Sequence, residues 1–250
     1  MQNLRIALLS DIHGNLPALE AVVADLNHRG VDAVINLGDS LSGPLLPLET
    51  AQYLMARDWT QLAGNHERQI LDDSKPRGTS DEYARSQLGT PELQWLATLR
   101  PWQDWGDGVY LCHATPQSDL IYLLETVEPG RVRVASAQEL ESRLGTVRAP
   151  LIACGHSHVA RSVRASDTSL IVNPGSVGLP GFIAQTPYPH FMQSASPDAR
   201  YAIAERRAGR WSAALITVPY DWDSMADLAQ ARGRPEWSRA LRTGYVSDLP

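Results

Sequence analysis

The sequence predicts an α/β fold whose sheet is at least partly parallel. Short apolar segments typical of buried strands alternate with segments in which apolar residues recur at helical spacing. Glycine-containing polar motifs follow several of these strands, as is common where the carboxyl ends of strands surround a ligand site. Because no internal repeat or linker interrupts the pattern, we expect a single domain over residues 1–250.

The N-terminal part of the chain is expected to alternate strand and helix. Leu4–Leu9 is a nearly continuous apolar run that predicts a buried strand. Asn15 can cap the next helix, whose apolar residues recur at helical spacing until Gly30 ends it. The elements expected next are a strand at 33–37, a helix at 48–57 and a strand at 59–63.

The remainder of the chain has shorter strands and two polar segments. Residues 72–90 are weakly patterned and predict a loop or a small cap, and residues 116–150 predict an excursion over the sheet with one helix near 136–144. The other expected elements are a helix at 91–99, strands at 109–112, 151–154 and 169–172, a hairpin formed by 201–205 and 211–218, and one or two amphipathic helices at 223–241.

Composition and charge limit the classes of function. A net charge of −6 does not favour nucleic acid as a partner, so an anionic substrate would need local positive charge, such as bound divalent metals. Two cysteines cannot form a disulfide framework, and the apolar run near the N-terminus is too short for a signal segment or a membrane span. We therefore expect a cytoplasmic protein with no membrane partner, and the oligomeric state stays open.

Histidine, aspartate and asparagine recur where the predicted strands end. Five of the seven histidines lie there, and the strand ends read SDIHGN, LGDS, AGNHE, CHATP and CGHSH. These side chains bind divalent transition metals through nitrogen and oxygen. Asp11 and His13 are two residues apart, as are His156 and His158, so in extended backbone each pair would share a face. Each motif alone fits a turn or a helix cap, but their recurrence indicates a metal centre.

The ordered set DIHGN, GD, GNHE, a strand-end histidine, GHSH and NPGS resembles the calcineurin-like metallophosphoesterase superfamily, and most closely its bacterial and archaeal branch of small phosphodiesterases. The resemblance spans roughly residues 4–218. It implies a two-sheet β-sandwich flanked by helices, a four-layer αββα fold. It also implies two divalent transition-metal ions, and the sequence does not choose among manganese, iron, zinc and nickel.

The resemblance gives each motif residue an implied role. The residues implied to hold the first ion are Asp11, His13 and His158, and those implied to hold the second are Asn65, His113 and His156. Asp39 matches the carboxylate that bridges both ions. His66 matches the histidine that touches the substrate, and Asn65 would contact the substrate as well as a metal.

The implied reaction is hydrolysis of a small phosphate ester by a metal-bridging hydroxide, with His66 as the general acid that protonates the leaving group. Protein phosphatases of the superfamily carry an acid and an arginine soon after the bridging aspartate and another arginine before GNHE. Here the segment after the bridging aspartate reads GDSLSGP, which contains Ser42 but neither the acid nor the arginine. Ala63 stands where the other arginine would precede GNHE. Arg68 could substitute as a phosphate contact, although a solvated helix residue is the simpler interpretation. For Asn15, a helix cap is favoured over substrate contact.

Three functions follow from these observations. A phosphodiesterase is favoured because the phosphate-binding arginines are absent from their usual places. A protein phosphatase or a dinucleoside-polyphosphate hydrolase of the same superfamily is the second, and a non-catalytic scaffold for partner binding, like the small retromer subunit, is the third. The scaffold predicts degraded ligand motifs, whereas every motif position is filled here.

Overall fold

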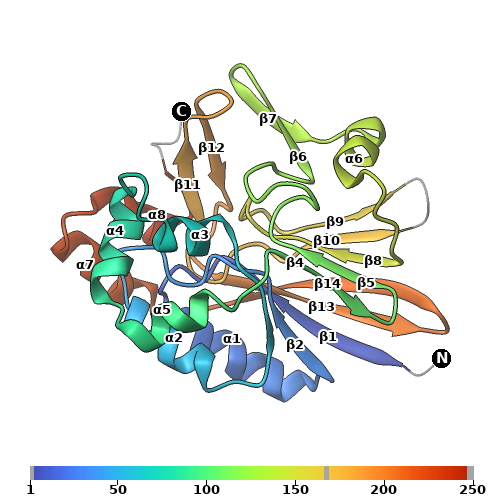
Figure 1. The fold of residues 1–250 in the computed structure, drawn as a ribbon, viewed down its shortest axis with the longest axis horizontal. Helices are drawn as coiled ribbons and strands as arrows, with labels where there is room; N and C mark the ends of the chain where they lie inside the picture. The colour runs from blue at the N-terminus through green and yellow to red at the C-terminus, as the bar shows by residue number, and fades with distance from the viewer. Residues whose placement is uncertain (1–2, 166–168, 247–250) are drawn as a thin grey trace.

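Two five-stranded sheets form the middle of the computed structural model, which describes residues 3–165 and 169–246 (Figure 1). In order across the first sheet, the strands are β14 (Arg210–Val218), β13 (Ala199–Arg207), β1 (Leu4–Leu9), β2 (Ala33–Asn36) and β3 (Thr60–Gln61). In order across the second, they are β4 (Trp102–Gly106), β5 (Val109–Cys112), β8 (Leu151–Ala153), β10 (Leu170–Asn173) and β9 (Arg161–Arg164).

Parallel pairing dominates where the two sheets carry the predicted polar motifs. β1, β2 and β3 are parallel neighbours, and β13 and β14 extend the first sheet as an antiparallel hairpin. β5, β8 and β10 are also parallel, with β4 and β9 antiparallel at the edges. The α/β class and the partly parallel sheet predicted from the sequence are confirmed.

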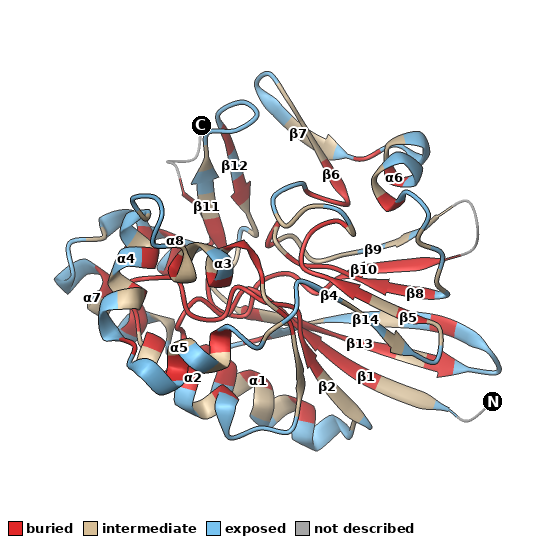
Figure 2. Cartoon of the chain, viewed as in Figure 1, coloured by how far each residue is buried: buried red, intermediate tan, exposed pale blue. Residues whose placement is uncertain are grey.

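The core lies between the two sheets. Its fully buried members include Ile6, Leu8, Ile35, Leu37, Val109, Leu111, Leu151 and Val172. Figure 2 shows the buried residues concentrated in these strands and in the loops that follow them. Central strands covered on both faces bury nearly every side chain, which is why they appear in the sequence as unbroken apolar runs.

Helices cover the outer face of each sheet and complete the four-layer αββα arrangement. α1 (Leu16–Arg29) packs on the first sheet, and α6 (Ala137–Leu144) packs on the second beside the buried thiols of Cys112 and Cys154. The remaining helices of the described residues are α2 (Pro47–Met55), α3 (Asn65–Leu71), α4 (Thr79–Gln87), α5 (Thr90–Leu96), α7 (Trp222–Ala231) and α8 (Pro235–Thr243).

The polar segments differ from the prediction. Residues 72–90 contain α4, which has acidic residues in its first turn and packs its Ala84 into the core. The excursion at 116–150 holds the expected helix but also a hairpin, β6 (Glu125–Glu128) and β7 (Arg131–Val134). A second unpredicted hairpin joins β11 (Gly181–Ala184) and β12 (His190–Gln193). These strands are only four residues long, and their side chains are mostly half-buried or exposed.

The expected C-terminal helices are present as α7 and α8, which pack together on Leu45 and Leu179 near the strand ends. The strand predicted at 59–63 is shorter than expected, with only two residues in β3. Among the described residues, none of the helices combines the length and the apolar character needed to cross a bilayer.

Candidate metal centre

Seven of the predicted site residues converge at the carboxyl ends of strands from both sheets. Each follows its strand within a few residues, except Asn65, which opens α3. Their coordinating atoms form two groups, one of Asp11, His13 and His158 and one of Asp39, His113 and His156. Within each group the ligand atoms lie within 4.8 Å of one another. The structure thus brings together residues as far apart in the chain as 11 and 158.

In the first group, lone pairs face one another with no proton between them. The Nδ1 atoms of His13 and His158 lie 2.7 Å from the Ser42 carbonyl and 2.6 Å from the Leu179 carbonyl. Each must donate there, so in a neutral ring Nε2 carries a lone pair. Burial together with the neighbouring histidines lowers the pKa of His13 to about 3, so its ring is neutral. Yet the two Nε2 atoms are 3.2 Å apart, a contact that a shared cation makes favourable.

Asp11 adds a negative charge to the same group. Its Oδ1 is buried, has no hydrogen-bond partner in the described part of the chain, and lies 3.3 Å from His158 Nε2. Its Oδ2 accepts the backbone N–H of His156 at 3.1 Å. A buried oxygen of this kind is costly unless something positive meets it. Two imidazole nitrogens and one carboxylate oxygen are a donor set that suits a divalent transition metal.

The second group repeats the pattern with the bridging candidate Asp39. His113 Nδ1 donates to the Leu37 carbonyl at 2.9 Å, which turns Nε2 toward Asp39 Oδ2 at 3.1 Å. Although burial lowers the pKa of His113, the Asp39 carboxylate outweighs it and raises that pKa to about 10. The nitrogen therefore has a strong affinity for positive charge, and a proton and a metal compete for it.

The amide of Asn65 completes the second group. Its oxygen points at Asp39 Oδ2, 3.2 Å away, and at His156 Nδ1, 3.0 Å away, while its nitrogen faces Gln69. Without a cation, exchanging the amide oxygen and nitrogen would satisfy these atoms. With a cation among them, the orientation found here is the favourable one. The donor set of Asp39, Asn65, His113 and His156 therefore fits a metal ion.

Backbone strain is concentrated at the same positions. The structure describes eight non-glycine residues with positive φ, and five of them are Asp11, His13, Asp39, His156 and His158, with φ between 54° and 68°. The extended backbone expected for the DIH and HSH pairs is therefore wrong, because each of these residues is left-handed. Such strain costs on the order of 1–3 kcal/mol per residue and gathers at functional sites, where it fixes side-chain direction.

Two motif glycines are required by space. A Cβ on Gly64 would lie 2.2 Å from Asp39 Oδ1, and a Cβ on Gly155 would lie 1.9 Å from Ser10 Oγ. The glycines before Asn65 and His156 therefore let the backbone approach the aspartates closely.

Glu67, the last residue of GNHE, holds the loop of Asp39 and Ser40 close to Gly64. It is fully buried, and its carboxylate accepts the backbone N–H groups of Asp39 at 2.8 Å, Ser40 at 2.7 Å and Gly64 at 2.7 Å. From the sequence it was interpretable only as an acid in the first turn of a helix. Its actual partners lie 27 or more residues away for Asp39 and Ser40, a separation that no local pattern reveals.

His66 lies beside the metal groups with a carboxylate behind it. Its Nδ1 is 2.7 Å from Asp81 Oδ1, and its Nε2 is 4.0 Å from Asp39 Oδ2. Burial lowers the pKa of His66, but the charges of Asp39 and Asp81 outweigh burial and raise it to about 9. The orienting acid that is absent from GDSLSGP is thus supplied by α4, from the segment predicted as a loop or cap. The only signal for it was the cluster of acids in TSDEYA.

The two secondary candidates for substrate contact point elsewhere. The Asn15 amide donates to the Gly178 carbonyl and to Tyr220 Oη, and accepts the Ala18 N–H as the cap of α1. The Arg68 side chain is half exposed, and its guanidinium donates to Asp119 at 2.7 and 3.0 Å. Neither residue lines the cavity beside the metal groups.

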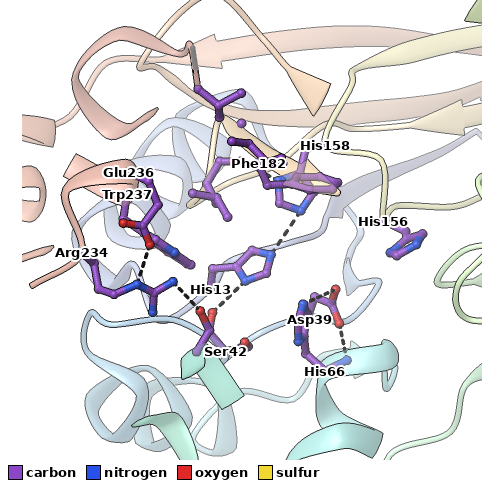
Figure 3. Close-up of a pocket in the computed structure, with 15 residues that line it drawn as sticks. His13, Asp39, Ser42, His66, His156, His158, Phe182, Arg234, Glu236 and Trp237 are labelled. Carbon is purple, nitrogen blue, oxygen red and sulfur yellow. Dashed lines mark hydrogen bonds and ion pairs between the residues drawn. The ribbon is translucent and has the colours of Figure 1, made fainter. Parts of the chain in front are cut away.

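That cavity has a volume of about 360 Å³. Figure 3 shows His13, Asp39, His66, His156 and His158 along it, with Arg234, Glu236 and Trp237 of the α8 region across from His156 and His66. The rest of the wall comes from Ser42, Ser80, Leu179, Gly181, Phe182, Ile183 and Val246. None of these residues of the α8 region was predicted from the sequence as a site residue.

Known proteins resemble this chain over nearly its whole length. The crystal structure of a metallophosphoesterase from Sphaerobacter thermophilus is 24% identical, covers 98% of this chain and 100% of its own, and superposes with a TM-score of 0.75. That of hypothetical protein PH1004 from Pyrococcus horikoshii is 18% identical, with coverage of 96% and 98% and a TM-score of 0.71. The uncharacterized protein MJ0912 of Methanocaldococcus jannaschii is 24% identical over 255 residues, 93% of this chain and 94% of its own.

A profile of the calcineurin-like phosphoesterase superfamily domain matches residues 4–192, well over half of the chain. That segment contains both ligand groups, Asn65, His66 and Asp81. The chain belongs to the calcineurin-like phosphoesterase superfamily.

Proposed function

We propose that the protein is a dinuclear metal-dependent phosphoesterase that hydrolyses phosphodiesters. The observation that carries the proposal is that several lone-pair atoms point at one another with no hydrogen between them. The clearest case is the 3.2 Å contact of His13 Nε2 and His158 Nε2. Two such groups lie side by side, with Asp39 between His113 and His66.

Bound divalent ions would supply a nucleophile by lowering the pKa of water and would offset charge on the phosphoryl oxygens. The protein's own residues do the rest. Asp11, Asp39 and the histidines fix where cations sit, and Glu67 keeps the Asp39 and Gly64 loops from separating. His66 holds a proton within reach of the cavity and donates it to the departing alkoxide, with Asp81 setting the ring orientation.

The charge of the cavity favours a diester over a monoester. A diester carries one negative charge at phosphorus, whereas a monoester carries nearly two at neutral pH. Among the described residues that line the cavity, Arg234 is the one arginine or lysine, and its Nε lies 2.6 Å from Glu236 Oε1. Among the described lining residues, no arginine or lysine without a carboxylate partner therefore meets a second phosphate charge.

The experiment compares metal-free and metal-loaded protein on four substrates: bis-p-nitrophenyl phosphate, p-nitrophenyl phosphate, a cyclic nucleotide and a phosphopeptide. Metal content is measured on the same samples. We expect about two ions per chain and the highest kcat/KM on a diester. Faster turnover of the phosphopeptide would support a protein phosphatase instead. Full metal loading without turnover of any ester would support the scaffold.

A further inference from the structure

The cavity beside the metal groups has a second wall, and the part of it that comes from the α8 region lies outside the segment that the superfamily profile matches. The profile ends at residue 192, whereas Arg234, Glu236, Trp237 and Val246 come from the α8 region. The superfamily motifs therefore account for the phosphate side of the cavity only.

Apolar and aromatic side chains dominate the second wall. The Trp237 ring meets the His13 ring edge-on at 5.9 Å, and the Phe182 ring meets the His158 ring edge-on at 4.6 Å. Leu179, Ile183 and Val246 also line the cavity. Each aromatic ring thus stands next to a histidine of the first metal group.

Trp237 is held rigidly in this position. Its side chain lies so close to Gly43 that a Cβ there would be 2.6 Å from the indole Cη2 atom, and the residue is only 7% exposed. It also belongs to the core cluster that joins α7 and α8 to the strand-end loops. A rigid aromatic wall loses little entropy when a flat group stacks or packs on it.

The polar end of the wall is electrically balanced. Arg234 donates through Nε to Glu236 at 2.6 Å and through Nη2 to Ser80 Oγ at 3.1 Å. Glu236 and Arg234 both line the cavity, so the positive charge of the guanidinium is already offset. The wall consequently suits an uncharged group better than a second anion.

We propose, on the basis of the function proposed above, that this cavity binds an uncharged aromatic group attached to the phosphorus centre. The volume of about 360 Å³ accommodates such a group beside the phosphate, since small-molecule pockets span roughly 300–1,000 Å³. The enzyme's substrates are then phosphate esters of an aryl or similarly flat apolar group, selected by Trp237 and Phe182.

The test measures binding of phenylphosphonate and methylphosphonate to Mn²⁺-loaded protein by calorimetry. Both present the same phosphonate group, and their P–C bonds are not ester bonds, so turnover does not enter. We expect phenylphosphonate to bind about 10-fold or more tightly, because only its ring buries apolar area on the second wall. Trp237→Ala and, separately, Phe182→Ala should each bring the ratio of the two affinities toward one.

Trp222→Ala is the matched control, since Trp222 lies on the neighbouring helix α7 and does not line the cavity. It should keep the ratio of the intact protein. If Trp237→Ala does not fold, Phe182→Ala on the β11 hairpin still decides the outcome. Equal binding of the two phosphonates by the intact protein, or a ratio unchanged in both variants, would overturn the proposal.

A third ligand tests the charge argument. 4-Carboxyphenylphosphonate should bind no more tightly than phenylphosphonate, and a 10-fold gain would make Arg234 a second anion site and overturn the choice of an uncharged group. The proposed function is tested apart from this, by turnover of bis-p-nitrophenyl phosphate. Turnover with equal phosphonate binding would leave the phosphoesterase standing and remove only the aromatic pocket. Absence of both turnover and phosphonate binding would remove both.

Discussion

The two walls of the cavity are built in different ways. The metal-side wall consists of short motifs at strand ends, and four of its residues, His13, Asp39, His156 and His158, adopt left-handed backbone conformations. The second wall, formed by the α8 region and the β11–β12 hairpin, consists mainly of apolar and aromatic side chains, with Arg234 and Glu236 at its polar end. The difference indicates that backbone strain and buried charge position the metal-binding side chains. Side-chain packing instead shapes the surface that meets the organic part of a ligand.

This comparison makes a general prediction. Changes on the metal side should reduce the turnover of every ester by a similar factor. Changes on the α8 side should alter the preference among ligands. The substitutions below test the metal side from the largest expected effect on turnover to the smallest.

Asp39→Asn is expected to have the largest effect. It removes the charge that faces His113 Nε2 at 3.1 Å and lies between the two groups. Metal content should fall from about two ions per chain to one or none. Turnover should fall by more than the roughly 10–100-fold typical of changes to outer-shell partners. Metal analysis and turnover of bis-p-nitrophenyl phosphate check this, and a variant that keeps both ions would not fit a shared ligand.

His66→Ala should reduce kcat by about 10²–10⁴-fold while leaving the metal content unchanged. The side chain lines the cavity and belongs to neither ligand group. His28→Ala, on the exposed side of α1, is the matched control and should behave like the intact protein. Parallel loss of metal and activity in His66→Ala would show that this histidine is a ligand and not the proton donor.

Asp81→Asn should have a smaller effect, because Asp81 is a positioning residue that acts through His66. It removes one of the carboxylate charges that hold the pKa of His66 at about 9. A general acid works in its protonated form, below its pKa, so lowering that pKa should move the alkaline limb of the kcat–pH profile to lower pH. A drop in kcat with an unmoved alkaline limb would assign Asp81 a purely structural role.

Glu67→Gln should affect stability more than turnover. A glutamine cannot accept from all three backbone N–H groups, because its own NH₂ would face at least one of them. Leaving a buried donor unpaired costs about 1–3 kcal/mol, which thermal or urea unfolding would detect. Glu82→Gln is the control, since Glu82 is exposed on α4, and should change stability by less than about 0.5 kcal/mol. Equal stability of the two variants would contradict the clamp role of Glu67.

The metal-side wall could be predicted from the sequence because its residues sit in local motifs. The end of a strand can be recognised in the sequence as an apolar run followed by glycine and a polar side chain, as in GNHE and GHSH. The division of ligands into two groups was implied by family resemblance, and the structure brings the same residues together. The backbone of those motifs was mispredicted, since alternation in extended chain does not anticipate left-handed residues at Asp11 or His158.

The other residues of the site could not be predicted, because long-range packing brings them there. Asp81 lies in a polar segment whose helix, α4, has no strong apolar pattern. That helix packs on the core through Ala84. Trp237 and Arg234 lie more than 150 residues from Ser80 and Gly43, the residues they contact, so no spacing links them. The strands of the β11–β12 hairpin beside the cavity are only four residues long and partly exposed, so they resemble the central strands less.

The most direct test of the central claim is an anomalous diffraction experiment on crystals of the Mn²⁺-loaded protein. The account predicts two peaks about 3.5–4 Å apart. One should lie among Asp11, His13 and His158, and the other among Asn65, His113 and His156, with Asp39 touching both. Crystals that bind manganese elsewhere, or hold no ion at these side chains, would contradict it.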